Sequence, residues 1–455
     1  MPKTALVLAT LLAALFLADC APAQQLHQTL GGCGTAAPLR TIRANPGNYR
    51  SLLNGLQPGD RLLLDPGTYT QGLFLWNKHG QPNRCIVVEG PATGAPALLV
   101  GSNSFNTVSL QNASYIAVRN LQLDGRGLAG DGVKGEGNSG GFTHHINLEN
   151  LALKGYGPNN QRCGVSTKSP AWNWVVRRLT IQGAGVGMYF GNSGGGAEFV
   201  NGLVEHNLIY DTLGYGIQIK HQLQRSTQLG MPASATTILR HNVVSKQNGS
   251  QSGADARPNL LVGHWPLSGA GATDVYQIYG NLFYGNPYEA LFQGEGNIAL
   301  HDNLFVNPSG PAAVRIQRHN SVPRRIEIFN NTVVSQGTGI TISGADAGYP
   351  QKVRGNAVFA ATPLSGGQQS ANVTGTYAAA RTHLNAPYAP LGSLDLYPRS
   401  GKLFGAAYDT MGLSAFVEWD RDFNRLSRIW GYRGAYSGDG VNPGWRPALE
   451  IKPAP

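Results

Sequence analysis

Basic and polar side chains recur at alternate positions of several short apolar segments. Alternate residues of a β-strand point to opposite faces, so these side chains would share one outer surface. Segment by segment, the outward residues are Lys134 and Glu136, Ser166 and Lys168, Tyr189, Gln218 and Lys220, and Arg315 and Gln317. Just beyond such segments lie His221, His264, Glu295 and Arg318. The spacing therefore predicts one polar, mostly basic surface.

A basic surface of this kind suits proton abstraction from a carbon beside a carboxylate. Positive charge near a developing enolate stabilises the transition state more than the ground state. A lysine among other cations has its neutral form favoured, so Lys220, flanked by Lys168 and His221, is the predicted base. Tyr189 or His264 would protonate the leaving oxygen. The other predicted substrate-binding residues are Lys134, Glu136, His144, Lys168, Gln218, His221, Arg315 and Arg318.

Other chemistries stay open at this point. An inverting hydrolase needs two carboxylates about 6.5–9.5 Å apart, and Glu136 with Asp131 is the candidate pair, with Glu295 as a further acid. His144 stands in the pair His144-His145, where a backbone-bonded structural histidine is the alternative. No dense acidic loop of a calcium site occurs, so we expect no cofactor, with calcium as the alternative. Trp172 and Trp174 could stack on sugar rings or pack within a turn.

A repeat organises the segments that carry these residues. Apolar strands follow Asn120, Asn150, Asn207, Asn242, Asn281, Asn303, Asn331 and Asn356, with Arg178 in the asparagine place once. Spacings run from 22 residues (Asn281 to Asn303) to 39 (Asn242 to Asn281). Such periods with short strands indicate a three-strand solenoid coil, and asparagine suits its tight corner. A β-propeller is the runner-up fold, but its blades need about 40 residues.

Composition agrees with an all-β solenoid. The 455 residues include 61 glycines and 27 prolines, and only 13% are charged, which favours short strands and frequent turns. By alternation, the residues predicted to face the core include Ile217, Ile219, Val314, Ile316, Ile340 and Ile342. A helix over Asn48–Leu56 would cover the open end of the hydrophobic stack. We expect a signal peptide at 1–23, a cap region at 24–57, a parallel β-helix at 58–365 and a C-terminal extension at 366–455 that packs on it.

At this point the chain resembles the right-handed parallel β-helix superfamily of pectate lyases, chondroitinase B-like and alginate lyases, and polygalacturonase-like hydrolases. The Gly59-Asp60…Pro66-Gly67-Thr68-Tyr69 entry and the asparagine-led strands carry the resemblance, which covers Pro58 to Pro363. It implies the fold and a substrate lying across one stack of strands, whereas chemistry belongs to sites grafted on the fold. The signature motifs of the individual families are missing. Leu239-Arg240-His241-Asn242 is a partial match to one Arg-His motif.

The N-terminus and the cysteines indicate an exported protein. An apolar run from Thr4 to Ala18 is too short to span a bilayer and fits a secretory signal, with cleavage after Ala23. A lipoprotein anchored through Cys20 is the alternative. In an oxidising compartment we expect a disulfide between Cys33 and Cys85, with Cys163 left as a buried thiol. The other possibility is three unpaired cysteines.

The charge balance narrows the partner. A formal net charge of +10 with so few charged residues favours an acidic partner. Export and the absence of lysine or arginine runs count against nucleic acid. The sequence thus predicts a secreted or periplasmic monomer, without a membrane span, that is a lyase or epimerase on an anionic uronate-containing polysaccharide. A glycoside hydrolase and a non-catalytic polysaccharide-binding solenoid are the alternatives.

Overall fold

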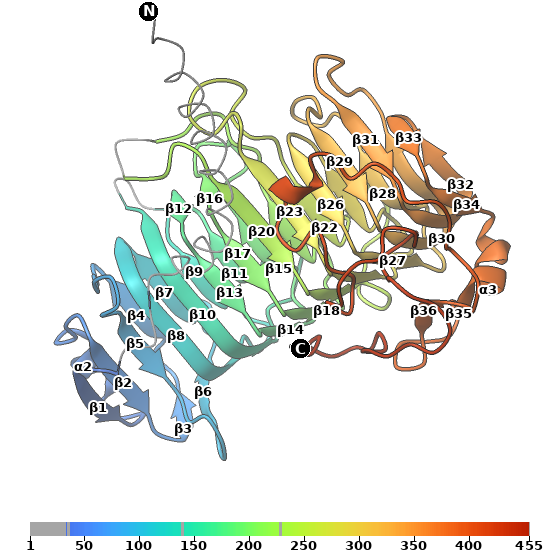
Figure 1. Cartoon of the computed structure of the whole chain (residues 1–455). Coiled ribbons are helices and arrows are strands. Elements are labelled where there is room, and N and C mark those ends of the chain that lie inside the picture. Colours follow the sequence, from blue (N-terminus) through green and yellow to red (C-terminus); the bar gives the residue numbers. More distant parts are fainter. Residues whose placement is uncertain (1–32, 34–36, 138–140, 227–229, 455) are drawn as a thin grey trace, which may run out of the picture.

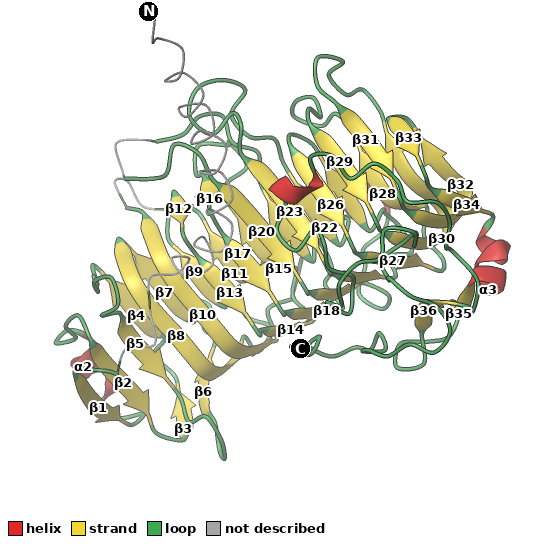
Figure 2. Ribbon diagram, viewed as in Figure 1, coloured by secondary structure: helices red, strands yellow, loops and turns green. Residues whose placement is uncertain are grey.

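The computed structural model describes residues 33, 37–137, 141–226 and 230–454. Short parallel strands stack coil upon coil from β1 at one end to β34 at the other, and loops connect them on every side (Figures 1 and 2). The chain is a right-handed parallel β-helix, as the repeat predicted. The predicted signal peptide and Cys20 lie outside the described residues.

Each full coil contributes strands to three stacks, which we number 1 to 3. Stack 1 consists of β4 (Leu73–Trp76), β7 (Val108–Gln111), β9 (Val133–Gly135), β11 (Cys163–Thr167), β15 (Val186–Phe190), β19 (Ile217–Ile219), β22 (Leu260–Val262), β25 (Phe292–Gly294), β28 (Ala312–Ile316) and the second halves of β30 (Thr332–Ile342) and β32 (Ala357–Ser365). Inward residues of this stack are buried, including Ile217, Ile219, Val314, Ile316, Ile340 and Ile342, which confirms the predicted register.

Stack 2 begins at the N-terminal end of the described chain. It consists of β1 (Arg40–Ala44), β2 (Asp60–Leu64), β5 (Ile86–Glu89), the first halves of β8 (Ala113–Asp124) and β10 (Thr143–Lys154), β13 (Val175–Arg177), β17 (Leu203–Glu205), β20 (Thr236–Arg240), β23 (Val275–Tyr279), β26 (Ile298–His301), β29 (Ile326–Phe329), β31 (Gln351–Arg354) and β33 (Gln368–Ser370). Two short strands, β12 (Ala171–Trp172) and β16 (Phe199–Val200), extend it next to the start of β10.

Stack 3 completes the coils. It consists of β3 (Gly67–Tyr69), β6 (Ala97–Val100), the second halves of β8 and β10, β14 (Thr180–Gln182), β18 (Leu208–Tyr210), β21 (Val243–Ser245), β24 (Leu282–Tyr284), β27 (Leu304–Asn307), the first halves of β30 and β32, and β34 (Val373–Gly375). Parallel pairing therefore begins at Arg40 and reaches Gly375, so the solenoid extends past the expected limits of 58 and 365 at both ends.

The corner between stacks 2 and 3 separates two kinds of asparagine that the repeat had grouped together. Asn120, Asn150 and Arg178 have positive φ and turn the chain, and His206 and His241 occupy that position in the next coils. The remaining asparagines stand one residue later and form a buried ladder. Its side-chain amides donate to the next coil's side-chain oxygen at 2.8–3.0 Å, through Asn207, Asn242, Asn281, Asn303, Asn331, Asn356 and Asn372.

Asn281 is the ladder residue that we expect to contribute strongly to the stability of the protein. Its Oδ1 accepts the backbone N–H and side-chain amide of Asn242, and its own amide donates to two carbonyls and to Asn303. Leu179 fills the equivalent position three coils earlier, so a leucine fits there. We therefore expect Asn281→Leu to lower the free energy of unfolding by about 2–4 kcal/mol, because buried groups lose their partners. Chemical denaturation measures this loss.

The control for this prediction is Asn150→Gly, at an exposed corner position with φ of 53°. Glycine adopts positive φ without strain, so the stability should change by less than about 1 kcal/mol. Equal effects of the two variants would contradict a special role for the ladder.

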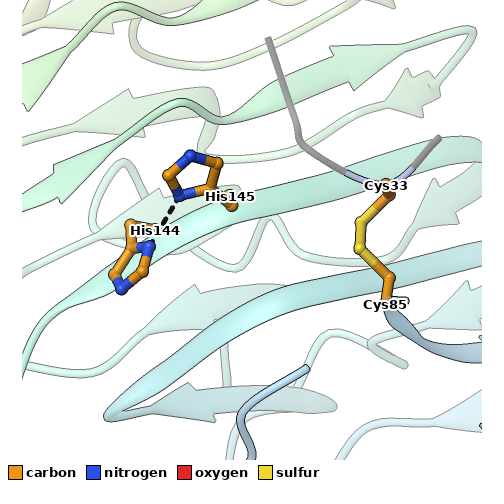
Figure 3. The surroundings of a disulfide bond; sticks show 4 residues. All are labelled: Cys33, Cys85, His144 and His145. Atoms are coloured by element: carbon orange, nitrogen blue, oxygen red, sulfur yellow. Dashed lines mark hydrogen bonds between the residues drawn. A yellow bond between two sulfur atoms is a disulfide. The ribbon is translucent and has the colours of Figure 1, made fainter. Parts of the chain in front are cut away.

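Both ends of the solenoid are covered. Helix α2 (Tyr49–Leu53) buries Tyr49 and Leu53 at the N-terminal end, as the predicted cap over Asn48–Leu56 required. The Cys33–Cys85 disulfide joins the N-terminal segment to the coil of β5, as predicted (Figure 3). Cys163 is a buried free thiol, which was also predicted. Beyond β34, helix α3 (Ala380–His383) and the antiparallel pair β35 (Leu384–Ala386) and β36 (Asp395–Pro398) pack at the other end.

The C-terminal segment then runs back across the coils (Figure 1). Arg428 is paired with buried Asp302, Glu418 lies 3.2 Å from Arg240, and the Lys452 ammonium donates to the Gly280 carbonyl at 2.9 Å. These contacts lie on stack 2 and on its corner with stack 3. None of the three covers the outer face of stack 1. Among the described residues, no helix is long and apolar enough to cross a membrane.

Candidate functional site

The outward residues of stack 1 form two rows, because parallel strands in register place equivalent residues side by side. The first row is Phe74, Ser109, Lys134, Ser166, Tyr189, Gln218, Leu261, Gln293, Arg315 and Thr341. The second row, two residues further along each strand, is Trp76, Gln111, Glu136, Lys168, Gly191, Lys220, Gly263, Glu295 and Gln317. Neighbouring members of a row are about 4.8 Å apart.

Lys220 stands between two glycines in the second row. A Cβ at Gly191, which has φ of 93°, would lie 3.1 Å from the Lys220 Cβ. A Cβ at Gly263 would lie 2.3 Å from the backbone nitrogen of His221. Glycine at both positions therefore leaves Lys220 as the only side chain of this row over three coils. It is half-buried and has no carboxylate within 4 Å among the residues that the structure describes.

Tyr189 lies between two lysines. The Lys168 ammonium is 3.3 Å from the centre of its ring, and the Lys220 ammonium is 6.0 Å away. Burial lowers the pKa of both lysines, and the charge of Arg257 lowers that of Lys220 further. Burial raises the pKa of Tyr189 to about 12, so its hydroxyl keeps its proton at neutral pH. The site thus combines a lysine that loses its proton more easily than usual with a neutral phenol.

The predicted histidines lie at the edge of this cluster. His221 follows Lys220 directly, and its ring stacks on His264 with 5.4 Å between ring centres. Burial lowers the pKa of His221, and the charges of His264 and Lys220 add to this effect. The Nδ1 of His264 lies 2.8 Å from the Trp265 carbonyl, which fixes the ring. The structure therefore brings together Lys168, Tyr189, Gln218, Lys220, His221 and His264.

Lys134 and Glu136 lie further toward the N-terminal end, where they are bound to other residues. The Lys134 ammonium lies 3.7 Å from Asp131 and 3.9 Å from Glu136. Asp131 is buried and accepts the Cys163 N–H and the Ser166 hydroxyl. Glu136 accepts hydrogen bonds from Asn106 and Ser109. Asp131 thus has a structural role. It is therefore a weaker candidate for one of the two catalytic carboxylates of a hydrolase.

The residues at the C-terminal end are separate from the cluster. Arg315 lies three coils beyond Gln218, about 14 Å along the face, and pairs with Glu289 at 2.8 Å. Arg318 is exposed and follows Gln317, which also lies three coils beyond Lys220. Glu295 is buried and accepts the backbone N–H groups of residues 319–321. Arg315 is therefore a paired cation, and Glu295 anchors a loop.

His144 belongs to a different part of the coil, at the start of β10. It stacks on Trp172 with 4.4 Å between ring centres, and its Nδ1 is 2.6 Å from the Nδ1 of His145 (Figure 3). Burial lowers the pKa of each histidine to about 4. Trp172 and Trp174 are both buried, so they pack in the turn and do not face solvent. His144, a predicted substrate-binding residue, therefore lies in neither outer row.

Sequence reasoning missed Arg257 and the buried state of Gln218. Arg257 precedes β22 in a loop, and its guanidinium lies 5.8 Å from the centre of the Tyr215 ring. The Oε1 of Gln218 is buried without a hydrogen-bond partner among the described residues, beside Tyr189 in the first row. An arginine in a loop carries no alternation signal, because its position depends on how that loop folds over the coils.

Among the residues that the structure describes, no group of three His, Cys, Asp or Glu side chains is placed to hold a metal ion. The expectation that no cofactor is needed stays a prediction.

Comparisons with known proteins identify the fold. No model of a known protein family matches the chain, and no curated protein matches it in sequence. The PL6 family alginate lyase AlyGC is 14% identical with a TM-score of 0.50, and the alignment covers 89% of this chain and 59% of AlyGC. Pectate lyase Pel9A is 14% identical (TM-score 0.45; 93% and 100% covered), and alginate lyase from Paenibacillus sp. str. FPU-7 is 15% identical (TM-score 0.42; 74% and 98% covered).

The likeness to AlyGC concerns the fold alone, and this chain spans about 59% of the length of that enzyme. The predicted right-handed parallel β-helix fold is confirmed.

Proposed function

We propose that the protein is an exported lyase or epimerase that acts on an anionic, uronate-containing polysaccharide by proton abstraction. The observation that carries this proposal is the place of Lys220, alone between Gly191 and Gly263 and beside the ring of Tyr189. Burial favours the neutral amine of Lys220, and the neutral amine is the form that accepts a proton.

Each residue of the cluster has one role in the proposed reaction. Lys168 binds the uronate carboxylate, which makes the proton on the adjacent ring carbon more acidic. The Lys220 amine takes that proton. In a lyase, the bond between the next ring carbon and the glycosidic oxygen then breaks, a carbon–carbon double bond forms, and Tyr189 gives its proton to the leaving oxygen. In an epimerase, the bond to the glycosidic oxygen stays intact and a water molecule on the opposite face of the ring gives a proton to the same carbon.

The placement of the two groups also favours one stereochemistry for the lyase. Lys220 and Tyr189 project from the same outer face, in adjacent coils. A sugar lying on this face would lose its proton and receive one from the same side. We therefore propose a syn elimination.

A glycoside hydrolase is less well supported by the same geometry. Asp131 and Glu295 are buried and hold backbone N–H groups, and Glu136 is bound by Asn106 and Ser109. The hydrogen bonds of Asp131 and Glu295 favour structural roles, and those of Glu136 hold one of its oxygens in place. The ammonium groups of Lys168 and Lys220, in contrast, have no hydrogen bond or ion pair to the residues that the structure describes. A non-catalytic solenoid would use the same cations to bind a polysaccharide. The assay below distinguishes this function from that of a lyase.

A panel of polymers tests the proposal. The purified protein is incubated with alginate, pectate, glycosaminoglycans and neutral glycans while the ultraviolet absorbance of unsaturated sugar is followed. New absorbance supports a lyase, and exchange of solvent deuterium into an uncleaved polymer supports an epimerase. Reducing ends without absorbance would indicate a hydrolase, and binding without turnover would indicate a binding solenoid. Repeating the assay in chelator tests the cofactor prediction, and sedimentation tests the predicted monomer.

The rate should increase with pH from neutral into the alkaline range. Lys220 must be deprotonated to act as a base, and its lowered pKa brings this transition below that of an exposed lysine. Tyr189, with a pKa of about 12, keeps its proton throughout the rise. A profile of kcat against pH at saturating concentrations of the best polymer checks this expectation. Saturation is needed because the pKa of Lys168 is lowered as well, and loss of its charge would raise KM. A decline between neutral pH and the usual range of lysine would contradict a lysine base.

A further inference from the structure

An exposed aromatic platform lies at the N-terminal end of stack 1. The Trp76 side chain is 45% exposed and stacks on Phe74, with 4.9 Å between ring centres and an interplanar angle of 5°. The ring of Phe105 meets Phe74 edge-on at 5.5 Å, and the Arg50 guanidinium lies 4.2 Å from the centre of the Phe74 ring. The Trp76 indole N–H donates to the Ser109 hydroxyl at 2.8 Å, so the orientation of the exposed ring is fixed.

The platform borders a cavity of about 400 Å³, which falls in the range of small-ligand sites. Its lining also contains Asn106, Gln111 and Glu136. One oxygen of Glu136, Oε1, accepts from Asn106 at 2.7 Å and from Ser109 at 2.8 Å. The other oxygen is 3.9 Å from the Lys134 ammonium, beyond hydrogen-bond distance. The carboxylate is thus held in place with one oxygen able to accept a hydroxyl group.

This combination has the chemistry of a sugar-ring site. A flat aromatic surface stacks on the apolar face of a pyranose, and a fixed carboxylate accepts its hydroxyl protons. None of the residues that line the cavity is cationic. The site therefore suits the ring face and hydroxyl groups of a sugar, in contrast to the cationic cluster around Lys220, which suits a carboxylate.

The second row of stack 1 connects the cavity with the cationic cluster around Lys220. Trp76, Gln111, Glu136, Lys168, Gly191 and Lys220 follow one another in register, one coil apart. Five coil spacings of about 4.8 Å separate Trp76 from Lys220 by roughly 24 Å. A pyranose in an extended polysaccharide advances by about one coil spacing, so a single chain lying along the row could reach both places.

We propose that Phe74, Trp76 and Glu136 form a distal subsite for a sugar ring of the same glycan chain whose uronate lies at Lys220. This inference rests on the proposed function and adds to it a preference for long chains. Binding energy from the distal ring holds the chain in register on the outer face, while the ring itself undergoes no reaction. Oligosaccharides too short to reach Trp76 do not gain this energy.

The test compares Trp76→Ala with the wild-type protein on oligomannuronates and oligogalacturonates of about three and about eight sugars. We expect the variant to bind the long oligosaccharides about tenfold more weakly in calorimetry and to bind the short ones with unchanged affinity. Trp76→Phe, which keeps an aromatic face, should restore most of the affinity. Tyr388→Ala removes an exposed ring from the C-terminal extension and should have no effect. The melting temperature of each variant checks its fold.

The outcomes separate this inference from the proposed function. Unchanged binding of the long oligosaccharides by Trp76→Ala, or an equal loss for both lengths, would overturn the subsite even if unsaturated products form. Length-dependent loss of binding without any turnover in the wild-type protein would support the subsite and overturn the lyase. Failure of Trp76→Phe to bind better than Trp76→Ala would also count against stacking.

Discussion

Replacing Lys220 with alanine should reduce kcat on the preferred polymer by about a thousandfold or more, with KM changed by only a few-fold. A positioned base contributes about 10²–10⁴-fold to a proton transfer, and in the proposed reaction no other residue reaches the same proton. Binding persists because Lys168 still holds the carboxylate beside Tyr189. Initial rates of unsaturated product formation measure kcat and KM, and the melting temperature shows that the variant is folded.

Two matched variants sharpen this prediction. Lys220→Arg keeps the positive charge but not a group that can be deprotonated, so it should be as inactive as the alanine variant. Lys352→Ala removes a lysine of β31 in stack 2, away from the outer rows, and should retain full activity. Full activity of Lys220→Ala would eliminate Lys220 as the base and shift the assignment to His264. Activity of Lys220→Arg with loss in Lys220→Ala would indicate a purely electrostatic role.

Replacing Ile316 with aspartate should lower the free energy of unfolding by about 4 kcal/mol or more. Ile316 is fully buried on the inner face of β28 between Gly294 and Ile342, where a carboxylate would have no charged partner. An unpaired charge in such a core loses its hydration without compensation. Chemical denaturation followed by circular dichroism gives the size of the loss.

The matched control is Thr341→Asp on the outer face of β30, whose register partner is Arg315. This carboxylate would stay hydrated near a cation, so the stability should change by less than about 1 kcal/mol. Similar losses for the two variants would contradict the assigned faces of stack 1.

The direction of side chains in stack 1 followed from the sequence, since alternation is a local property of the strand. Ile217 and Ile219 were predicted to be buried, and Lys220 was predicted in an outer row with Lys168 two coils before it. The structure has each of them so placed. The N-terminal helix and the disulfide were likewise predicted, because an open hydrophobic end needs a cover and an oxidising compartment favours paired cysteines.

The partners of the polar residues did not follow from the sequence. Arg315 was expected to bind substrate, and the structure pairs it with Glu289 of the preceding coil. Glu295 was expected near the chemistry, yet it holds a loop that begins at His319. In both cases the deciding group lies more than twenty residues away, and its approach depends on the path of a loop.

The sequence by itself therefore determined the solenoid, the inner and outer faces of its strands, and the basic character of one face, because period and alternation are properties of short segments. Only the tertiary structure decided which asparagines form the ladder, which cations are neutralised by carboxylates, and that Gly191 and Gly263 leave Lys220 alone beside Tyr189. These features depend on which residues of successive coils come into register, and loops of unequal length set that register.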